Sequence, residues 1–563
     1  MTGKPTREAR LKIGLLVASK MVPAYTYKLA EWGQKHRDLV ISHVIVLESA
    51  WETKSNWLAR TNRSIRRLGF LNFVRYCSLA VLEGLERLRL RKLTGEDNFR
   101  KYDICDIFQN LSYVELTPRE GLLRDRYSSE DVHKLTSLGL DIIVTVGPHE
   151  ALQGEMLKVA KLGVIAVDNG DIGESSQSPF GFWEVYSQED ATGFAIRLLT
   201  DEHQGGNALI GGRIPTKHFY LFNRDLLHAR GNYYLMKLLE ETALNGNLPR
   251  FKGSFSDFDK PSGFPSLTTQ IIYLIHQVSA FAKKATTRFL LRKRYRWGVS
   301  FARHDWPILE RQRSYKIRGP HNHFLADPFV IDEGGQQFCF VEDYNYEIGR
   351  ACISVYALRG EKAERLGEAI TESYHLSFPY LFRFERKLYM CPETTEHRDI
   401  RVYECVEFPL QWKLCKVLMR DVFAADTMIF ERDGVWWLFS NIDPINVDSC
   451  SELLIFYADS PLSADWTAHQ KNPIFIDSTK ARNAGLLFQD GSIYRVAQRQ
   501  GFDLYGKAIS INKIEVLDTK NYEETEICTV EPKFLPGIRA AHHLHSSHGI
   551  SVFDYDELAR IGE

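Results

Sequence analysis

The sequence predicts a multidomain protein in which an α/β Rossmann-like domain is followed by an all-β five-bladed propeller. Strand-like and helix-like segments alternate over residues 11–230, which is typical of a parallel sheet. Short apolar runs then recur over residues 300–560 at intervals of about 50 to 60 residues, the size of one four-stranded blade. The length of 563 residues also exceeds what one ordinary hydrophobic core contains.

The domain boundaries expected from these patterns divide the chain into three parts. Residues 1–245 form the α/β domain, which carries a basic helical insertion at 54–95. Residues 246–300 form a basic helical linker, and residues 301–563 form the propeller.

The α/β domain is predicted from four buried strands. They are KIGLLVAS (12–19), SHVIVLES (42–49), DIIVTVGP (141–148) and GVIAVDNG (163–170). Ligands of such sheets bind at the carboxyl ends of the strands. This places the expected ligand edge near Ala18, Gly147 and Asp168.

Charge and cysteine content exclude some classes of protein. Lys and Arg number 71 and Asp and Glu 72, so the bulk charge argues against a general nucleic-acid binder. The nine cysteines form no CxxC pair, which is typical of reduced thiols in a cytoplasmic protein. The apolar run from Ile13 to Ala18 is short and indicates a first strand rather than a signal peptide, and no transmembrane helix is expected.

Two basic stretches, 54–95 and 270–298, allow two interpretations. In the first interpretation, which is the commoner case, they are surface helices with solvated basic faces. Alternatively, they contact a membrane surface that carries an anionic or lipid-linked substrate. The second interpretation extends the expected cytoplasmic location to peripheral attachment at the inner membrane face.

The propeller is predicted from five segments that share a loose pattern, each followed by a second strand. The first strands are FLADPFVI (324–331), HLSFPYLF (375–382), AADTMIF (424–430), ARNAGLLF (481–488) and AAHHLHSS (540–547). The second strands are QFCFVED (337–343), KLYMCPE (387–393), VWWLFSN (435–441), SIYRVAQ (492–498) and GISVFDY (549–555). Three of the first four turns, EGG, RDG and QDG, have hairpin chemistry, and FER does not.

Polar residues recur at one position of these inner strands, which line the channel of a propeller. The position holds Asp327, Asp426, Asn483 and His543, with Phe378 as the apolar exception. The ends of the second strands add Glu342, Glu393, Asn441 and Gln498, and His375 and Arg482 surround them. Glycosidic chemistry needs one carboxyl group as acid and another as base or nucleophile. The alternative for each carboxylate is a hydrogen bond to nearby backbone.

The propeller motifs resemble those of five-bladed glycoside hydrolases and of fructosyl- or arabinosyl-active enzymes, in which an Asp of the first blade is the base. Asp327 matches that position. The region is more similar to the N-terminal propeller of plant glucosamine inositolphosphorylceramide transferases and bacterial relatives. The motifs are ADPF (326–329), SFP (377–379), PE (392–393), ADT (425–427), RNAG (482–485), and Gln498 with YG (505–506). The second blade lacks the Asp that such hydrolases place at Phe378, so simple hydrolysis is not expected.

The N-terminal part resembles a folate-dependent formyltransferase domain, as found in sugar N-formyltransferases. The motifs are DIIVTVG (141–147), GVIAVDNGD (163–171), GFWEVY (181–186), TGFAIRLLTDEHQGG (192–206) and IPT (214–216). Such domains use Asn, His and Asp, and these places fall on Ala166, Asp168 and Gln204. We expect a retained fold without this chemistry; Asp168 with Asp171 is the alternative pair, because a carboxylate can also act as general base.

Metal sites and dinucleotide or P-loop nucleotide sites are not expected. His542, His543, His545 and His548 are interpreted as hydrogen-bonded channel histidines, since no partner carboxylate stands at fixed spacing. No GxGxxG or GxxxxGK[ST] loop occurs.

These observations lead to three functional hypotheses. The first is a glycan-active enzyme of surface-polysaccharide or glycolipid biosynthesis, with Asp327 as base or nucleophile, Glu393 or Glu342 as acid, and Asp426 orienting the sugar. In it Arg482 and His375 would hold an anionic group, and the α/β domain would bind a nucleotide-sugar or acceptor glycan. The second is a sugar N-formyltransferase using formyl-tetrahydrofolate. The third is a non-catalytic glycan-binding scaffold.

Overall fold

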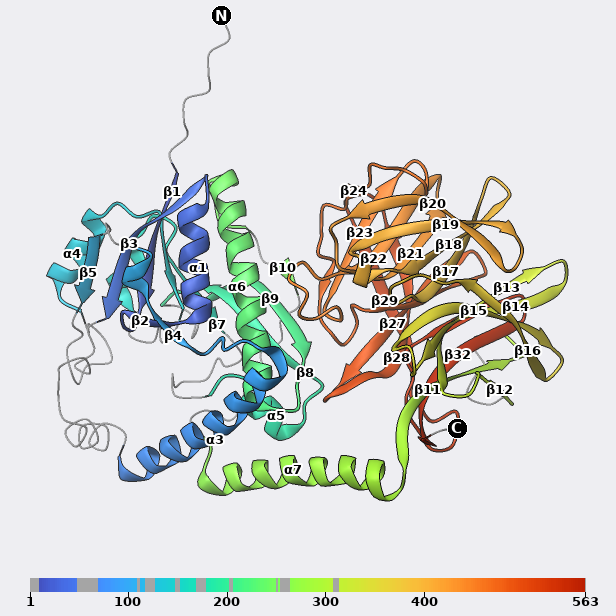
Figure 1. Ribbon diagram of the computed structural model, residues 1–563. Coiled ribbons are helices and arrows are strands. Elements are labelled where there is room, and N and C mark those ends of the chain that lie inside the picture. The colour runs from blue at the N-terminus through green and yellow to red at the C-terminus, as the bar shows by residue number, and fades with distance from the viewer. Residues whose placement is uncertain are drawn as a thin grey trace, which may run out of the picture. The chain divides into compact units, whose positions relative to one another are not determined.

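The computed structural model forms two compact units, shown in Figure 1. It describes residues 10–47, 69–108, 112–116, 127–146, 152–168, 179–201, 206–249, 252–253, 264–306 and 313–561. Unit 1 comprises Met1–Gly212 and Thr216–Gln277, and unit 2 comprises Arg213–Pro215 and Val278–Glu563. Unit 1 contains a mostly parallel α/β sheet and unit 2 a five-bladed β-propeller, so the fold class is confirmed at this level.

The sheet of unit 1 has the strand order β10-β9-β8-β7-β6-β1-β3-β5. The bounds are β1 Leu11–Val17, β3 Leu39–Leu47, β5 Ser112–Leu116, β6 Ile142–Thr145, β7 Val164–Asp168, β8 Ala191–Leu198, β9 Asn207–Pro215 and β10 Lys252–Gly253. The central strand β1 pairs in parallel with β3 and β6, and its continuous apolar run is almost entirely buried, as expected for a strand covered on both faces. β7 pairs antiparallel with β8, which makes the sheet mixed. A separate pair joins β2 (Met21–Pro23) to β4 (Lys101–Asp103).

The helices outside the propeller include one that lies on the sheet and two that leave an apolar face exposed; the second of these two, α7, continues from unit 1 into unit 2 at Val278. The bounds are α1 Ala24–Lys35, α3 Phe70–Thr94, α4 Ser129–Ser137, α5 Phe182–Ser187, α6 Tyr220–Asn245 and α7 Leu267–Ala285, with 3-10 turns at Ile104–Asp106 and Gly154–Lys158. α6 buries Leu227, Leu235 and Leu238 and packs on β7 and β8. The expected helix of the basic insertion is present as α3; residues 54–68 of that insertion lie outside the described residues.

The propeller of unit 2 consists of five antiparallel blades. Blade 1 is β13 His323–Glu333, β14 Gln336–Asn345, β15 Arg350–Arg359 and β16 Lys362–Ile370. Blade 2 is β17 Ser377–Phe384, β18 Lys387–Glu393, β19 Asp399–Glu407 and β20 Gln411–Arg420. Blade 3 is β21 Ala424–Arg432, β22 Val435–Ile442, β23 Glu452–Ala458, β24 Thr467–Ala468 and β25 Phe475–Ile476. Blade 4 is β26 Asn483–Gln489, β27 Ser492–Gly501, β28 Leu504–Leu517 and β29 Tyr522–Val530.

Blade 5 combines strands from both ends of the propeller region. Its strands are β11 Lys293–Ala302, β12 Tyr315–Ile317, β30 Ile538–Ala540, β31 Leu544–Ser547 and β32 Ile550–Arg560. β11 pairs with β32 from Lys293 opposite Arg560 to Ala302 opposite Ser551. This long antiparallel ladder closes the ring, so that the inner strands of the blade come from the C-terminal end and the outer strands from its beginning.

The hairpin turns between first and second strands share one backbone conformation. Both central residues of the turn are left-handed at Gly334–Gly335, Asp433–Gly434 and Asp490–Gly491. The turn FER, which lacks glycine, nevertheless has Glu385 at φ 48° and Arg386 at φ 64°. Two-residue hairpins favour this geometry because its twist matches that of the strands, and here the strand pairing imposes it on residues that do not favour it.

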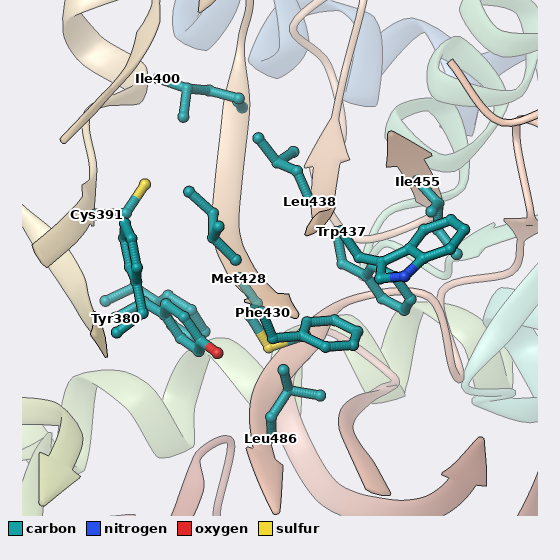
Figure 2. Close-up of a cluster of buried hydrophobic side chains, with 14 of the residues drawn as sticks. Tyr380, Cys391, Ile400, Met428, Phe430, Trp437, Leu438, Ile455 and Leu486 are labelled. Carbon is teal, nitrogen blue, oxygen red and sulfur yellow. The ribbon is translucent and has the colours of Figure 1, made fainter. Parts of the chain in front are cut away.

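A large apolar cluster of the propeller contains residues from the first to the fourth strands of successive blades. Figure 2 shows Tyr380 and Cys391 of blade 2, Met428, Phe430 and Trp437 of blade 3, and Leu486 of blade 4 among its members. Met428 and Leu438 are fully buried. The blades are therefore held to one another by close-packed side chains, which fixes the inner strands that carry the candidate site.

Candidate active site

The inner strands of blades 1, 2 and 3 share a bulge near the propeller axis. In each the strand register shifts by one residue, and the residue at the shift is left-handed: Asp327 at φ 48°, Phe378 at φ 46° and Asp426 at φ 47°. Such a conformation is uncommon for residues other than glycine, and it concentrates at functional sites. In blade 4 the left-handed residue is Gly485, so Asn483 does not share the geometry of Asp327 and Asp426.

Side chains of each blade accept the backbone N–H of the next blade. Asp554 of blade 5 accepts from Asp327 N at 3.2 Å, and Asp327 accepts from Phe378 N at 3.2 Å. Glu393 of blade 2 accepts from Asp426 N at 3.3 Å. The series continues where Asn441 Oδ1 of blade 3 accepts from Asn483 N at 2.8 Å. Of the predicted carboxylates, Asp327 and Glu393 therefore bind nearby backbone, which is the alternative considered for each, whereas the carboxyl groups of Asp426 and Glu342 contact side chains.

His542 lies between two buried carboxylates. Its Nε2 is 3.1 Å from Asp327 Oδ1, and its Nδ1 is 3.0 Å from Asp554 Oδ2. Burial alone would lower the pKa of His542, but Asp554 and Asp327 raise that pKa well above its usual value. Burial likewise opposes ionisation of Asp327, yet the positive charge of His542 lowers the pKa of Asp327 to about 2. Asp327 is therefore a carboxylate at neutral pH.

The same three residues are a candidate metal cluster, because one ligand atom from each of Asp327, His542 and Asp554 lies within 4.8 Å of the others. Asp554 already accepts backbone N–H groups from His542, His543 and Asp327. The two carboxylates also lie at opposite nitrogens of the imidazole. A protonated imidazole fits this arrangement better than a metal ion, which would bind one nitrogen only.

Glu342 is a second buried carboxyl group of blade 1, and its pKa is raised where that of Asp327 is lowered. Its Oε1 lies 3.3 Å from His375 Nε2. Ala351 N donates to His375 Nδ1 at 3.2 Å, which leaves Nε2 as the nitrogen that presents a proton to Glu342. Burial raises the pKa of Glu342 to about 7; the His375 hydrogen bond opposes this rise and the charge of Asp327 adds to it. Glu342 therefore exchanges a proton near neutral pH.

Arg482 joins Asp426 to Glu393. Its Nε donates to Asp426 Oδ2 at 2.6 Å, and its Nη2 donates to Asp426 Oδ1 at 3.2 Å and to Glu393 Oε2 at 3.4 Å. Its Nη1 contacts the carbonyl and hydroxyl of Ser449. Because a guanidinium has five N–H donors, these contacts engage all of them. Arg482 thus balances two carboxylates and has no donor left for the anionic group that the sequence led us to expect there.

Groups other than Arg482 also hold Asp426 in place. Gln498 Nε2 donates to Asp426 Oδ2 at 3.1 Å, and Asn483 Nδ2 donates to the Asp426 carbonyl at 2.9 Å. Burial, together with the charges of Glu393 and Asp327, raises the pKa of Asp426 against the opposing effect of Arg482. Gln498 is 1% exposed and also donates to the Asn483 carbonyl, so it positions Asp426 rather than reaching solvent.

His543 is buried beside aromatic rings instead of facing a polar cavity. Its ring centre lies 4.5 Å from that of Phe329 and 5.3 Å from that of Phe378. Burial lowers the pKa of His543 to about 4, and its Nδ1 lies 3.9 Å from Asp327 Oδ1. His543 is thus neutral at pH 7 and packs against the back of the Asp327 carboxylate.

Two aromatic residues beside the site were missed as site residues. The ring centres of Trp297 and Tyr505 lie 4.0 Å and 5.2 Å from that of His542. The guanidinium of Arg482 lies 5.6 Å from the Tyr505 ring centre, and Tyr505 is 39% exposed. An exposed ring above a carboxylate cluster is a suitable stacking surface for a sugar. The dipeptide YG was one signal: a Cβ at Gly506 would come within 2.4 Å of the His542 Cβ, so only glycine lets this hairpin approach.

The structure thus brings eight of the predicted site residues into one connected group in the propeller. They are Asp327, Glu342, His375, Glu393, Asp426, Arg482, Gln498 and His543. Asp168 ends β7 in unit 1, and its side chain lies outside the described residues, as do Asp171 and Gln204. Ala166 is fully buried within β7 and offers no functional group. The sequence did not predict Asp554, Trp297 or Tyr505 as site residues, and it predicted His542 only as a hydrogen-bonded channel histidine.

Comparison with known proteins gives a similarity over most of the propeller. The family model described as "Glucosamine inositolphosphorylceramide transferase 1, N-terminal" matches residues 304–552. The transferase of that name from Arabidopsis thaliana is 37% identical over 231 residues, which are 39% of this chain and 30% of the relative. The one from Oryza sativa subsp. japonica is 37% identical over 215 residues, 37% of this chain and 28% of the relative. The chain therefore spans less than a third of the length of these curated relatives.

Solved structures give weaker matches. A family 117 glycoside hydrolase from Zobellia galactanivorans is 11% identical with a TM-score of 0.32, covering 46% of this chain and 91% of that one. The catalytic domain of a GH62 α-L-arabinofuranosidase from Coprinopsis cinerea has the same identity and TM-score and covers 46% of this chain and 97% of that one. Likeness at this level carries no conclusion about function. The α/β sheet of unit 1 has no family assigned to it by these matches.

Proposed function

We propose that the propeller carries out glycosyl chemistry as part of glycolipid or surface-polysaccharide assembly, with a sugar donor and a glycolipid acceptor as substrates. The observation that carries this proposal is a pair of buried carboxyl groups in blade 1, each beside its own histidine, whose pKa values are shifted in opposite directions. Asp327 has a pKa near 2 and Glu342 a pKa near 7. A pair whose environments separate the two pKa values in this way is suited to acid and base roles at one site.

In this proposal Glu342 is the acid and Asp327 the base or nucleophile. Glu342, partly protonated at neutral pH, would give its proton to the leaving oxygen of the donor. Asp327, kept ionised by His542, would take the proton of the acceptor hydroxyl or attack the sugar carbon. His375 would return a proton to Glu342 from its more exposed position, since its side chain is 33% exposed and that of Glu342 is 9% exposed.

The remaining polar residues position these two groups. Asp426 and Glu393 are bound to Arg482, so their roles are charge balance and orientation of the sugar rather than proton transfer. Tyr505 and Trp297 would supply the stacking face for a sugar ring. The similarity to glucosamine inositolphosphorylceramide transferases supports transfer to a lipid-linked acceptor over hydrolysis.

A second candidate is glycan binding without turnover. It is favoured by the match itself, which covers only the N-terminal family model and less than a third of the relatives. It is also consistent with the complete internal engagement of Arg482. In this case the carboxylates would shape a sugar pocket, and Glu342→Gln would leave ligand affinity nearly unchanged.

The experiment that separates these functions is a turnover and binding screen with the purified full chain. The probes are nucleotide-sugars, lipid-linked glycans and formyl-tetrahydrofolate, and the variants are Asp327→Asn, Glu342→Gln and the control Asp332→Asn on the same strand as Asp327. Glycosyl turnover that is lost in the first two variants and kept in the control supports catalysis in the propeller. Binding without turnover supports the second candidate. Formyl transfer that survives Asp327→Asn would overturn both and assign the activity to unit 1.

A further inference from the structure

Two helices outside the propeller expose apolar side chains in ordered stripes. On α7 the residues Ile271, Leu274, Ile275, Val278 and Phe281, here called the α7 stripe, are each 44% to 66% exposed. On α3 the residues Phe70, Leu71, Val81, Leu85 and Leu88, here called the α3 stripe, are each 57% to 70% exposed. The α7 stripe recurs at intervals of three and four residues; on α3, Val81, Leu85 and Leu88 have this spacing and Phe70 lies three turns before Val81, so each set lies along one face of its helix. Apolar surface of this kind, gathered rather than scattered, marks an interaction site.

The α7 stripe is the outer face of a helix whose inner face is fixed to α3. Gln270 Nε2 donates to the Arg75 carbonyl at 3.0 Å, and Ser78 Oγ donates to Gln270 Oε1 at 2.7 Å. The Tyr273 hydroxyl donates to the buried carboxyl of Glu86. These polar contacts hold Gln270 and Tyr273 inward, and both residues are buried. The inner face of α7 therefore already has its partners on α3, and the exposed stripe lies outside that face of the helix.

The charged residues of the segment that carries the α7 stripe all have one sign, although Glu86 of α3 contacts Tyr273 and Asp503 pairs with Lys284. No acidic residue occurs from Leu267 to Ala302. Lys283, Arg288 and Arg292 follow the stripe and are exposed, and the apolar side chains of Phe289 and Leu290 between them are 77% and 79% exposed. On α3 the basic residues Arg89, Arg91 and Lys92 follow the α3 stripe at the C-terminal end of the helix. An apolar face with basic residues at its end matches the chemistry of an anionic lipid surface.

We propose that α7, assisted by α3, binds the surface of a membrane that contains anionic phospholipid. The apolar side chains enter the boundary between headgroups and acyl chains, and the basic residues contact lipid phosphates. A second copy of the chain is a poorer occupant, because the segment from Leu267 to Ala302 offers no acidic residue to pair with Lys283, Arg288 and Arg292 of the other copy. Among the described helices, moreover, none combines the length and apolar character needed to cross a bilayer, so the contact is interfacial.

This inference does not depend on the proposed function, since both helices lie outside the residues that the family model matches. It gives a reason for a glycan-active propeller to share a chain with these helices. A lipid-linked substrate is confined to the membrane surface, and a protein held there meets it at a higher local concentration.

The test is co-sedimentation of the full chain with vesicles. One set contains phosphatidylcholine alone and the other phosphatidylcholine mixed with phosphatidylserine. We expect binding to the mixed vesicles that weakens with added salt. The double variant Leu274→Glu/Val278→Glu should lower that binding by at least about tenfold, because it places charge in the apolar boundary. The triple variant Lys283→Gln/Arg288→Gln/Arg292→Gln should lower it by roughly fivefold for each charge removed.

The matched control is Leu244→Glu, which changes an apolar side chain on α6 that is 76% exposed and lies outside both stripes. It should bind vesicles as the wild type does. Because every substituted side chain is exposed, unchanged thermal unfolding will show that the variants fold. Absence of binding to either vesicle, or equal binding by the double variant, would overturn the proposal. So would a stable dimer in sedimentation velocity that the double variant dissociates, because the occupant would then be a second copy.

Discussion

Asp554 Oδ2 accepts the backbone N–H of Asp327 at 3.2 Å, although the two residues are 227 positions apart in the chain. Asp554 Oδ1 accepts two further backbone N–H groups, from His542 and His543, at 2.9 Å each. One fully buried carboxylate thus fixes both the left-handed bulge of blade 1 and the inner turn of blade 5. The conformation of Asp327 therefore depends on the closure of the ring, since Asp554 lies on the strand that pairs with β11.

Substitution of Asp554 should be among the most destabilising single changes in the propeller. Asp554→Ala leaves three backbone N–H groups buried without an acceptor and His542 with one carboxylate instead of two. We expect the free energy of unfolding to fall by about 3 to 5 kcal/mol, as when one partner of a buried charged group is removed. Urea unfolding followed by tryptophan fluorescence measures this.

The matched control for Asp554→Ala is Asp556→Ala, two residues further along the same strand. Asp556 contacts Arg539, whose side chain is 44% exposed, at 2.6 Å. Loss of such a partly exposed ion pair costs about 1 kcal/mol or less. Equal losses in the two variants would contradict the role assigned to Asp554.

Repeat spacing was sufficient to predict the propeller but not the way it closes. The four inner strands before blade 5 carry local patterns, and from these patterns alone the sequence predicts that Asp327, Asp426 and their companions lie near one axis. Residues 293–300 were assigned to the helical linker because their Arg and Lys residues suggested a solvated helix, whereas β11 begins at Lys293. Strand pairing between the two ends of a region has no local signal. Asp554 and Trp297 were missed for the same reason, because each acts on groups from a distant segment.

The turn FER shows that a hairpin can form where no local pattern predicts it. Its residues do not favour a left-handed conformation, so no hairpin signal is present there. Glu385 and Arg386 nevertheless both adopt the left-handed conformation. The pairing of β17 with β18 across this turn, with its apolar faces buried, outweighs the local cost. The protonation states of the site residues could not be predicted from the sequence either. They follow from burial and from neighbouring charges that the fold brings together, as at Glu342 and His375.

The stability of the propeller should depend on pH through His542. Its pKa in the folded protein is raised well above the usual value by Asp554 and Asp327 against the effect of burial. A raised pKa gives stability that is fully present below the unfolded pKa of about 6.5 and is lost as the pH rises through the folded pKa. We therefore expect the free energy of unfolding to fall above about pH 6.5, by at most about 1.4 kcal/mol per pH unit.

The variant His542→Gln isolates this effect. It should be less stable than the wild type at pH 6, since two carboxylates lose their cation, and its stability should vary less between pH 6.5 and 9. Urea unfolding at several pH values gives both quantities. Parallel curves for the two proteins would show that His542 does not titrate as a partner of Asp327.

Glu342 should carry a titration near pH 7 that can be observed without a substrate. Burial raises its pKa to about 7, so the side chain is protonated in acid and loses its proton as the pH passes neutrality. Infrared difference spectra recorded below and above pH 7 should show a protonated carboxyl band that disappears at the higher pH. The band should be absent in Glu342→Gln and present in the control Glu347→Gln, which changes an exposed carboxylate of the same blade.

The same titration should appear in the rate once a glycosyl donor is identified. If Glu342 is the acid, kcat/KM falls above about pH 7, and Glu342→Gln loses activity by about 10² to 10⁴-fold and with it this limb of the profile. A rate that keeps the same fall above pH 7 in the variant would assign the limb to another group.

Tyr505 should contribute to sugar affinity through its ring rather than its hydroxyl. The ring is partly exposed beside Arg482 and His542, so a sugar that reaches the carboxylates would pass over it. Tyr505→Ala should weaken binding of a glycan ligand by about tenfold, in line with the loss of one aromatic contact, while Tyr505→Phe should change it much less. Isothermal titration calorimetry with the ligand found in the screen measures the affinity of both variants.

Because Tyr505 is partly exposed, Tyr505→Ala should leave the free energy of unfolding close to that of the wild type, so that a loss of affinity reports on stacking. Equal weakening by the two variants would instead indicate that the hydroxyl binds the sugar.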